Sequence, residues 1–237
     1  MRCVGHRVMS RPCHWMAPLR AGVRPRTLRS VVVLPAPLGP SGAGKTTTLR
    51  SILGLTPARS GTIEWQGRDI TRWPTHRIAR LGIGWVPDDR RVFPTLTASR
   101  NLAIARKPSP FPGYSTEACS DIFPALRNLL PRECENMSGG ELQMVSISRA
   151  LSGGPGLVLF DEPSQGLAPK VVQDVMRTIR TLRDNGVASV VVDQNVRTVL
   201  DVADRIYVMH LGRIVHEGTA AALRDDADAR TALGLAA

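Results

Sequence analysis

The chain has 237 residues, of which 43% are hydrophobic, and a formal net charge of +11. Its longest apolar runs are far below the roughly 18 residues that a membrane-spanning helix needs, so we expect no segment to cross a bilayer. Residues 1–38 hold seven arginines and no acidic residue, and the other 199 residues are only mildly basic. Because nucleic-acid binding needs a clustered basic face on a folded domain, the composition argues against a nucleic-acid partner.

The N-terminal segment differs in character from the rest of the chain. We expect residues 1–37 to be an atypical arginine-rich segment, either disordered or mistranslated, and residues 38–237 to form one folded domain. Pro35 and Pro37 fall within its valine-rich run, and proline removes donors from a central strand. We therefore expect the first 38 residues to contribute no native strand.

Beyond residue 38, short apolar runs alternate with longer helical patterns, which is typical of an α/β fold with a mostly parallel sheet. Residues 156–160 and 187–192 are continuously apolar apart from one serine, as strands buried on both faces are. Residues 106–113 are rich in proline and precede a helical pattern over 115–130. We interpret the region from about 91 to 151 as an inserted helical subdomain.

Residues 39–46 read GPSGAGKT, which fits the G-x-x-x-x-G-K-[ST] pattern of a phosphate-binding loop. Glycines allow backbone N–H groups to face phosphates, Lys45 can reach the β- and γ-phosphates, and the Thr46 hydroxyl can ligate Mg²⁺. The alternative is an ordinary glycine-rich turn. The predicted ATP-binding residues are Gly39, Pro40, Ser41, Gly42, Ala43, Gly44, Lys45, Thr46 and Thr47.

Two carboxylates follow the apolar run at residues 157–160. Asp161 is placed to coordinate Mg²⁺, and Glu162 is placed to orient the water that attacks the γ-phosphate. The alternative interpretation is a helix cap made by the Asp-Glu-Pro sequence.

Between these two motifs, residues 137–143 read MSGGELQ. This resembles the signature motif of the ABC transporter ATPases, with Met for Leu and Glu for Gln, and the resemblance covers the chain from about residue 38. It implies that the signature residues bind ATP held by a second ATPase subunit, in a head-to-tail dimer. The residues concerned are Ser138, Gly139, Gly140 and Glu141.

Within this family, residues 85–93, 161–169 and 192–196 are similar to the ATPase subunits of branched-chain amino-acid importers. Asp88 stands where most members have the Q-loop glutamine, and Gln194 stands where most have the switch histidine. The resemblance implies that Glu162 and Gln194 are catalytic. The implied metal ligands are Thr46, Asp161 and Asp88.

The resemblance implies a P-loop NTPase fold: a RecA-like core with a mostly parallel sheet, an inserted helical subdomain, and N-terminal antiparallel strands that are atypical or missing. It also implies ATP and Mg²⁺ as cofactors, two transmembrane permease subunits, a solute-binding protein, and a second ATPase subunit that is a sister chain or a copy of this one. The expected location is the cytoplasmic face of the cell membrane. The alternatives are a non-transport ABC ATPase and a catalytically impaired pseudo-ATPase.

Overall fold

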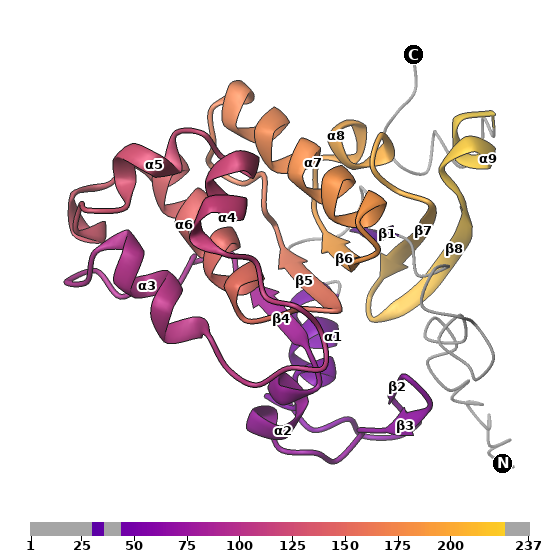
Figure 1. The fold of residues 1–237 in the computed structure, drawn as a ribbon. Coiled ribbons are helices and arrows are strands. Elements are labelled where there is room, and N and C mark those ends of the chain that lie inside the picture. Colours follow the sequence, from indigo (N-terminus) through magenta and orange to yellow (C-terminus); the bar gives the residue numbers. More distant parts are fainter. Residues whose placement is uncertain (1–29, 36–43, 226–237) are drawn as a thin grey trace, which may run out of the picture.

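A six-stranded sheet forms the centre of the structure, a computed structural model that describes residues 30–35 and 44–225 (Figure 1). The strand order is β4-β5-β6-β1-β7-β8, with parallel pairing throughout except for the antiparallel pair of β7 and β8. In chain order the strands are β1 (Ser30–Pro35), β4 (Ile83–Val86), β5 (Leu157–Asp161), β6 (Ala188–Val192), β7 (Arg205–His210) and β8 (Arg213–Thr219).

Strand β1 corrects the expectation that the first 38 residues supply no native strand. It lies inside the sheet, with Val32 in register with Val191 of β6 on one side and Ile206 of β7 on the other. Pro35 is the last residue of the strand. A proline at that end leaves the donors of the preceding residues in place, so it ends the strand without excluding it.

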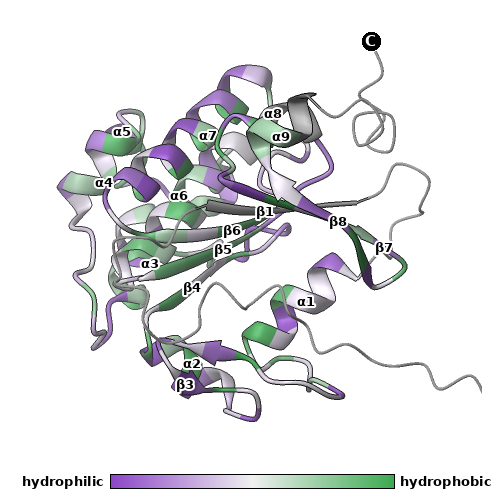
Figure 2. Ribbon diagram, turned by 90° about the vertical axis from the view of Figure 1, so that its right-hand side faces the viewer, coloured by the Kyte–Doolittle hydropathy of each residue, from purple (hydrophilic) through white to green (hydrophobic). Residues whose placement is uncertain are grey.

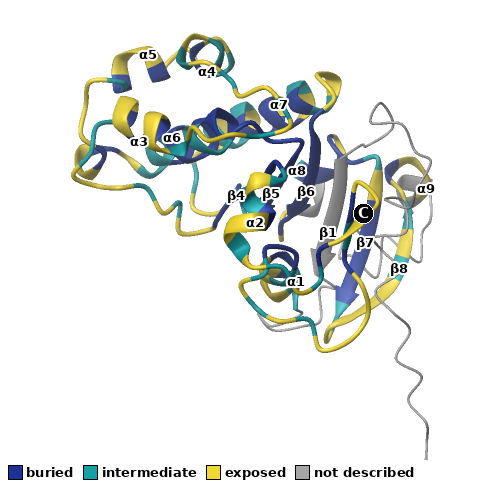
Figure 3. Cartoon of the chain, turned by 60° about the horizontal axis from the view of Figure 1, so that its bottom comes forward, coloured by how far each residue is buried: buried dark blue, intermediate teal, exposed yellow. Residues whose placement is uncertain are grey.

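Strands β5 and β6 are buried on both faces, whereas the edge strand β8 is largely exposed. Alternate residues of a buried strand belong to different hydrophobic clusters. In β5, Val158 and Phe160 pack with α6 (Gly139–Ser152) and α7 (Pro169–Asp184), whereas Leu157 and Leu159 pack with α1 (Lys45–Ile52). This is the period of two that a strand imposes on its side chains. Figure 2 shows β5 as an apolar strand between these helix layers, and Figure 3 shows β5 and β6 as buried.

The helices fall into three groups around this sheet. The first group, on one face, is α1 (Lys45–Ile52) with α2 (Thr75–Arg80). The second is α7 (Pro169–Asp184) with α8 (Val196–Leu200) on the other face, and α9 (Ala220–Asp225) follows β8. The third lies between β4 and β5 in the chain and comprises α3 (Ala98–Ala105), α4 (Thr116–Ile122), α5 (Leu126–Leu129), a 3₁₀ helix (Cys134–Asn136) and α6 (Gly139–Ser152).

The third group is built on α6, against which α3, α4 and α5 pack. The helical pattern at residues 115–130 is split into α4 and α5 around Pro124, because proline disfavours a helical conformation in the residue before it. The assignment of about residues 91–151 to a separate helical subdomain stays a prediction. Within residues 30–35 and 44–225, no helix has the length and hydropathy to cross a membrane.

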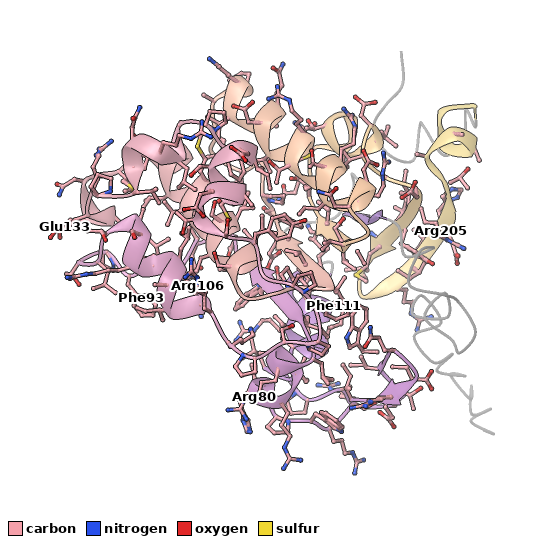
Figure 4. The ribbon with its side chains drawn as sticks, viewed as in Figure 1. Arg80, Phe93, Arg106, Phe111, Glu133 and Arg205 are labelled. Carbon is pink, nitrogen blue, oxygen red and sulfur yellow. The ribbon has the colours of Figure 1, made fainter. Side chains whose placement is uncertain are left out.

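The loop after α3 returns to the sheet through Phe111, which lies near β4 and apart from Phe93 and Glu133 (Figure 4). A Cβ on Gly156, just before β5, would overlap the Phe111 ring. The ring also contacts Trp65, with the ring centres 6.4 Å apart. Trp65 belongs to a two-stranded antiparallel hairpin, β2 (Glu64–Trp65) and β3 (Arg68–Asp69).

Candidate functional site

The end of the predicted phosphate loop is formed by Gly44 and the first turn of α1. Gly44 has a φ of 93°, in the left-handed region that glycine adopts without strain. Its carbonyl accepts hydrogen bonds from the Thr48 backbone N–H and hydroxyl, both at 2.9 Å. The partial positive charge of this helix end suits a phosphate, and Thr47 is exposed in its first turn. The predicted residues Gly39, Pro40, Ser41, Gly42 and Ala43 lie outside the described part of the chain.

Lys45, Glu162 and Gln194 form one connected group where β5, β6 and α1 meet. The Nζ atom of Lys45 lies 3.6 Å from Oε1 of Glu162, with the two side chains 7% and 15% exposed. Nε2 of Gln194 lies 2.8 Å from each carboxylate oxygen of Glu162 and donates to them. The structure thus brings together the predicted phosphate-binding lysine and the two predicted catalytic residues.

Glu162 owes its position to an unusual backbone conformation directly after β5. Its φ is 47°, a left-handed value that costs a residue with a Cβ about 1–3 kcal/mol. The Glu162 N–H donates to the Val192 carbonyl oxygen at 2.7 Å, which ties the turn to the end of β6. Strained backbone of this kind is concentrated at functional sites, and here it directs the carboxylate toward Lys45 and Gln194.

Asp161 is the last residue of β5 and is buried. Its Oδ1 accepts a hydrogen bond from the Thr46 hydroxyl at 3.2 Å, whereas Oδ2 is buried with no hydrogen-bond partner. Burial, followed by the negative charges of Asp88 and Glu162, raises the pKa of Asp161 from 3.8 to about 6, against the lowering effects of Thr46 and Lys45. An unpartnered carboxylate oxygen beside a hydroxyl is a donor set that fits Mg²⁺.

Asp88, the third predicted metal ligand, lies in the exposed turn after β4, close enough for its charge to act on Asp161. Its Oδ1 accepts a hydrogen bond from the Asp89 N–H at 2.9 Å. Within the described residues, no cluster of three or more His, Cys, Asp or Glu side chains could hold a metal. A site of this kind suits Mg²⁺ bound largely by water and substrate phosphate, with few protein ligands.

Asp193 is not among the residues predicted from the sequence, although it organises the loops around Glu162 and Gln194. It is buried at the end of β6, where its Oδ1 accepts hydrogen bonds from the Ser164 hydroxyl and the Asn195 N–H, both at 2.8 Å. Burial raises the pKa of this carboxyl despite those bonds. Hydrogen bonds to the Asp193 carboxylate therefore hold the segment after Glu162 next to the segment that contains Gln194. The available signal was an acidic residue that directly follows a continuous apolar strand.

The predicted signature residues form the N-terminus of α6. Ser138 caps the helix, and Oε2 of Glu141 accepts the Ser138 N–H at 2.7 Å in a reciprocal capping box. Oε1 of Glu141 also accepts from Nη1 of Arg132 at 2.9 Å, and these hydrogen bonds lower the pKa of Glu141. The Glu141 carboxylate is thus engaged within its own subunit, and the Gly139 and Gly140 N–H groups stand at the start of the helix.

The structure leaves these two groups of predicted residues apart within one chain. Among the hydrogen bonds and ion pairs of the described residues, none joins residues 138–141 to Lys45, Thr46, Asp161 or Glu162. Each group is the kind of site that would bind phosphate.

The model of the ABC transporter family matches residues 34–165. The match begins four residues before the predicted onset of family-like sequence and includes the end of β1. It extends through the predicted phosphate loop, the signature and both carboxylates at the end of β5.

Relatives and solved structures match over most of the chain. The high-affinity branched-chain amino acid transport ATP-binding protein BraG of Pseudomonas aeruginosa is 40% identical over 197 residues, 82% of this chain and 84% of its own. The lipopolysaccharide export system ATP-binding protein LptB of Acidithiobacillus ferridurans is 36% identical over 192 residues, 80% of each chain. A crystal structure of the ADP conformation of an ATP-binding cassette of an ABC transporter has a TM-score of 0.68 and 25% identity, with 86% of each chain covered.

These similarities agree with the geometry. The parallel sheet, the lysine at the start of α1 and the two carboxylates at the end of β5 have the arrangement of a P-loop NTPase. The chain belongs to the ABC transporter ATP-binding family and, as a member of it, hydrolyses ATP in a reaction coupled to transport.

Proposed function

We propose that this chain is the ATPase subunit of an importer for branched-chain or other small amino acids. For catalysis, the observation that carries the proposal is the contact of Glu162 with both Lys45 and Gln194. For the solute, the support is the 40% identity to BraG and the similarity of residues 85–93, 161–169 and 192–196 to that subgroup. The 36% identity to LptB makes an export ATPase the second candidate.

In this proposal each catalytic side chain has one task. Lys45 neutralises β- and γ-phosphate charge, and Glu162 accepts a hydrogen bond from the attacking water and orients it. Gln194 keeps the Glu162 carboxylate in place and can donate a hydrogen bond to phosphate, although unlike histidine it cannot carry a proton.

Thr46 and Asp161, with Asp88 nearby, would hold Mg²⁺. When bound, the cation neutralises the charge that develops on the phosphate oxygens. The Thr46 hydroxyl donates a hydrogen bond to Asp161 and keeps its lone pairs for a cation. The unpartnered Oδ2 of Asp161 supports this assignment.

The active unit would be a head-to-tail dimer in which Ser138, Gly139 and Gly140 contact the ATP of the other subunit. The support is the helix N-terminus at Gly139, which makes no hydrogen bond or ion pair to the lysine and carboxylates of its own chain in the described residues. We propose two permease subunits and a solute-binding protein as further partners, at the cytoplasmic face of the membrane. The second ATPase is either a copy of this chain or a sister subunit.

Transport in proteoliposomes tests the solute. The chain would be purified with its membrane partners and reconstituted with ATP, and uptake of labelled leucine would be measured with and without the solute-binding protein. Glu162→Gln is the matched control, because it keeps the fold and removes turnover. We expect ATP-dependent leucine uptake that the control lacks. ATP turnover stimulated by lipopolysaccharide, with no leucine uptake, would assign the chain to export instead.

A further inference from the structure

Arg90 lies in the turn that follows β4, and its backbone is fixed by α6. Arg90 and Arg91 have φ values of 62° and 40°, so two consecutive residues with a Cβ occupy the left-handed region. The Arg90 carbonyl accepts a hydrogen bond from the Ser146 hydroxyl in the middle of α6 at 2.8 Å. This strained turn persists only because its surroundings hold it.

The Arg90 guanidinium covers the first residue of α6. A Cβ built on Gly139 would lie 3.4 Å from Nη1 and 3.5 Å from both Cζ and Nη2. A point about 3.4–3.5 Å from Nη1, Cζ and Nη2 alike lies above the plane of these three atoms, over the flat face of the guanidinium. The α-carbon of Gly139 therefore faces the guanidinium plane, and a larger side chain here would meet it.

The same guanidinium reaches the loop between β5 and α7. Its Nη2 donates to the Gln165 carbonyl oxygen at 3.3 Å. On the other side of the helix start, a Cβ on Gly140 would lie 3.1 Å from Cγ2 of Val171 in α7. The N-terminus of α6 is thus packed between Arg90 and the start of α7.

The Nε atom of Arg90 is buried with no hydrogen-bond partner in the part of the chain that the structure describes. Burying such a donor costs free energy, so the contacts of the remaining guanidinium atoms must offset it. Lysine could not replace this arrangement, because a single ammonium lacks a flat face and a fixed fork of donors.

We propose that Arg90 is a positioning residue that holds the start of α6 and the backbone of Gln165 in one arrangement relative to the turn of Asp88. The signature residues and the loop after Glu162 would then face the partner subunit as one unit. This inference rests on the proposed composite site. Arg90 acts through these segments, since its described contacts outside its own turn are to Gly139, Ser146 and Gln165.

The test compares Arg90→Ala and Arg90→Lys with Arg91→Ala. Arg91→Ala is a matched control, because it removes the same charge from the same turn. The Arg91 side chain pairs instead with Asp89, and its Cζ lies 5.4 Å from the centre of the Trp85 ring. Steady-state ATP turnover would be measured in the assembled transporter, and backbone hydrogen exchange in the isolated chain without nucleotide.

For both Arg90 variants we expect kcat to fall about tenfold, the loss that about 1.4 kcal/mol of positioning energy produces, with the KM for ATP within about twofold of the parent. Exchange should accelerate together in residues 139–142 and 164–167. Arg91→Ala should match the parent in both measurements. Parent-like kcat in Arg90→Ala, full rescue by Arg90→Lys, or faster exchange confined to residues 88–92 would overturn the proposal.

The two measurements separate this inference from the proposed function. If the parent assembly neither dimerises nor hydrolyses ATP, the composite site fails. The exchange experiment on the isolated chain still decides whether Arg90 joins the two segments: a joint acceleration supports the link and independent behaviour refutes it.

Discussion

Gln194 donates from Nε2 to both carboxylate oxygens of Glu162, at 2.8 Å each. Oε1 of the same carboxylate also lies 3.6 Å from Nζ of Lys45. Within this chain the Glu162 carboxylate is therefore held by the neutral amide of Gln194 and by the positive charge of Lys45. ATP must compete with Glu162 for Lys45, whereas the amide of Gln194 can continue to orient the carboxylate.

This relationship predicts different defects for two substitutions. Lys45→Ala should weaken ATP binding about 10- to 150-fold, because charge-assisted hydrogen bonds contribute about 1.5–3 kcal/mol. Glu162→Gln should keep ATP binding and lower turnover about 10²- to 10⁴-fold, since only the water-orienting carboxylate is lost. Nucleotide titration and steady-state hydrolysis measure the two effects, and near-parent turnover in Glu162→Gln would reassign the catalytic base.

The raised pKa of Asp161 predicts a pH-dependent stability of the metal-free protein. A buried carboxyl with a pKa near 6 in the folded state and 3.8 in the unfolded state binds more protons when folded. Its ionisation therefore lowers the free energy of unfolding as pH rises from about 4 to 6, and the penalty is complete above 6. Asp161→Asn should raise Tm at pH 7.5, with a smaller gain at pH 5.

Thermal unfolding without Mg²⁺ or nucleotide measures this difference. Asp121→Asn is a suitable control, because Asp121 is 71% exposed in a surface pair and such pairs contribute little. A Tm gain for Asp161→Asn that is equal at pH 5 and pH 7.5 would contradict the assignment of the effect to this carboxyl.

The helix-start geometry predicts that Ser138→Arg blocks ATP-driven dimerisation and leaves ATP binding to the monomer unchanged. A bulky cation would occupy the N-terminus of α6, where the proposed site needs a small cap and free N–H groups. Size-exclusion chromatography with ATP in a Glu162→Gln background follows the dimer. Dimerisation of the Ser138→Arg protein at the ATP concentrations that dimerise the parent protein would disprove the signature assignment.

The interior position of β1 predicts a strong effect of proline at Val32. This backbone lies between β6 and β7, so proline would remove a ladder donor and leave a buried acceptor unpaired, at a cost of about 1–3 kcal/mol. Ser30→Pro is the control, because the first residue of a strand tolerates proline. Chemical denaturation compares the two, and equal stabilities would mean that β1 is not part of the native sheet.

Phe111 and Gly156 should show strong coupling in a double-mutant cycle. Gly156→Ala would force the Phe111 ring aside, at a cost of about 1–3 kcal/mol of overpacking. In a Phe111→Ala background the added methyl group meets no ring and should cost much less. Additive effects in denaturant unfolding would show that this ring does not occupy the space over Gly156.

Where local pattern carried the information, the sequence predicted the fold well. The continuous apolar runs at 156–160 and 187–192 are β5 and β6 because strands buried on both faces need no polar alternation. The prediction that the first 38 residues supply no strand is wrong at β1, because Pro35 does not exclude a central strand that ends at it. Only the register shows that this proline is the last paired residue, beyond the donors of Val31 to Val33.

Motif spacing and hydrophobic period are local properties, so the sequence alone predicts which chemical groups lie on strands and at helix starts. Lys45, Thr46, Asp161 and Glu162 are predicted in this way as site residues, and the structure places Lys45 beside Glu162 and Thr46 beside Asp161. Only the folded chain shows that Asp193 bonds to two loops, that Glu141 belongs to a helix cap, and that the Arg90 guanidinium lies over Gly139. Such contacts join residues distant in the chain or depend on backbone torsions, and no local pattern encodes them.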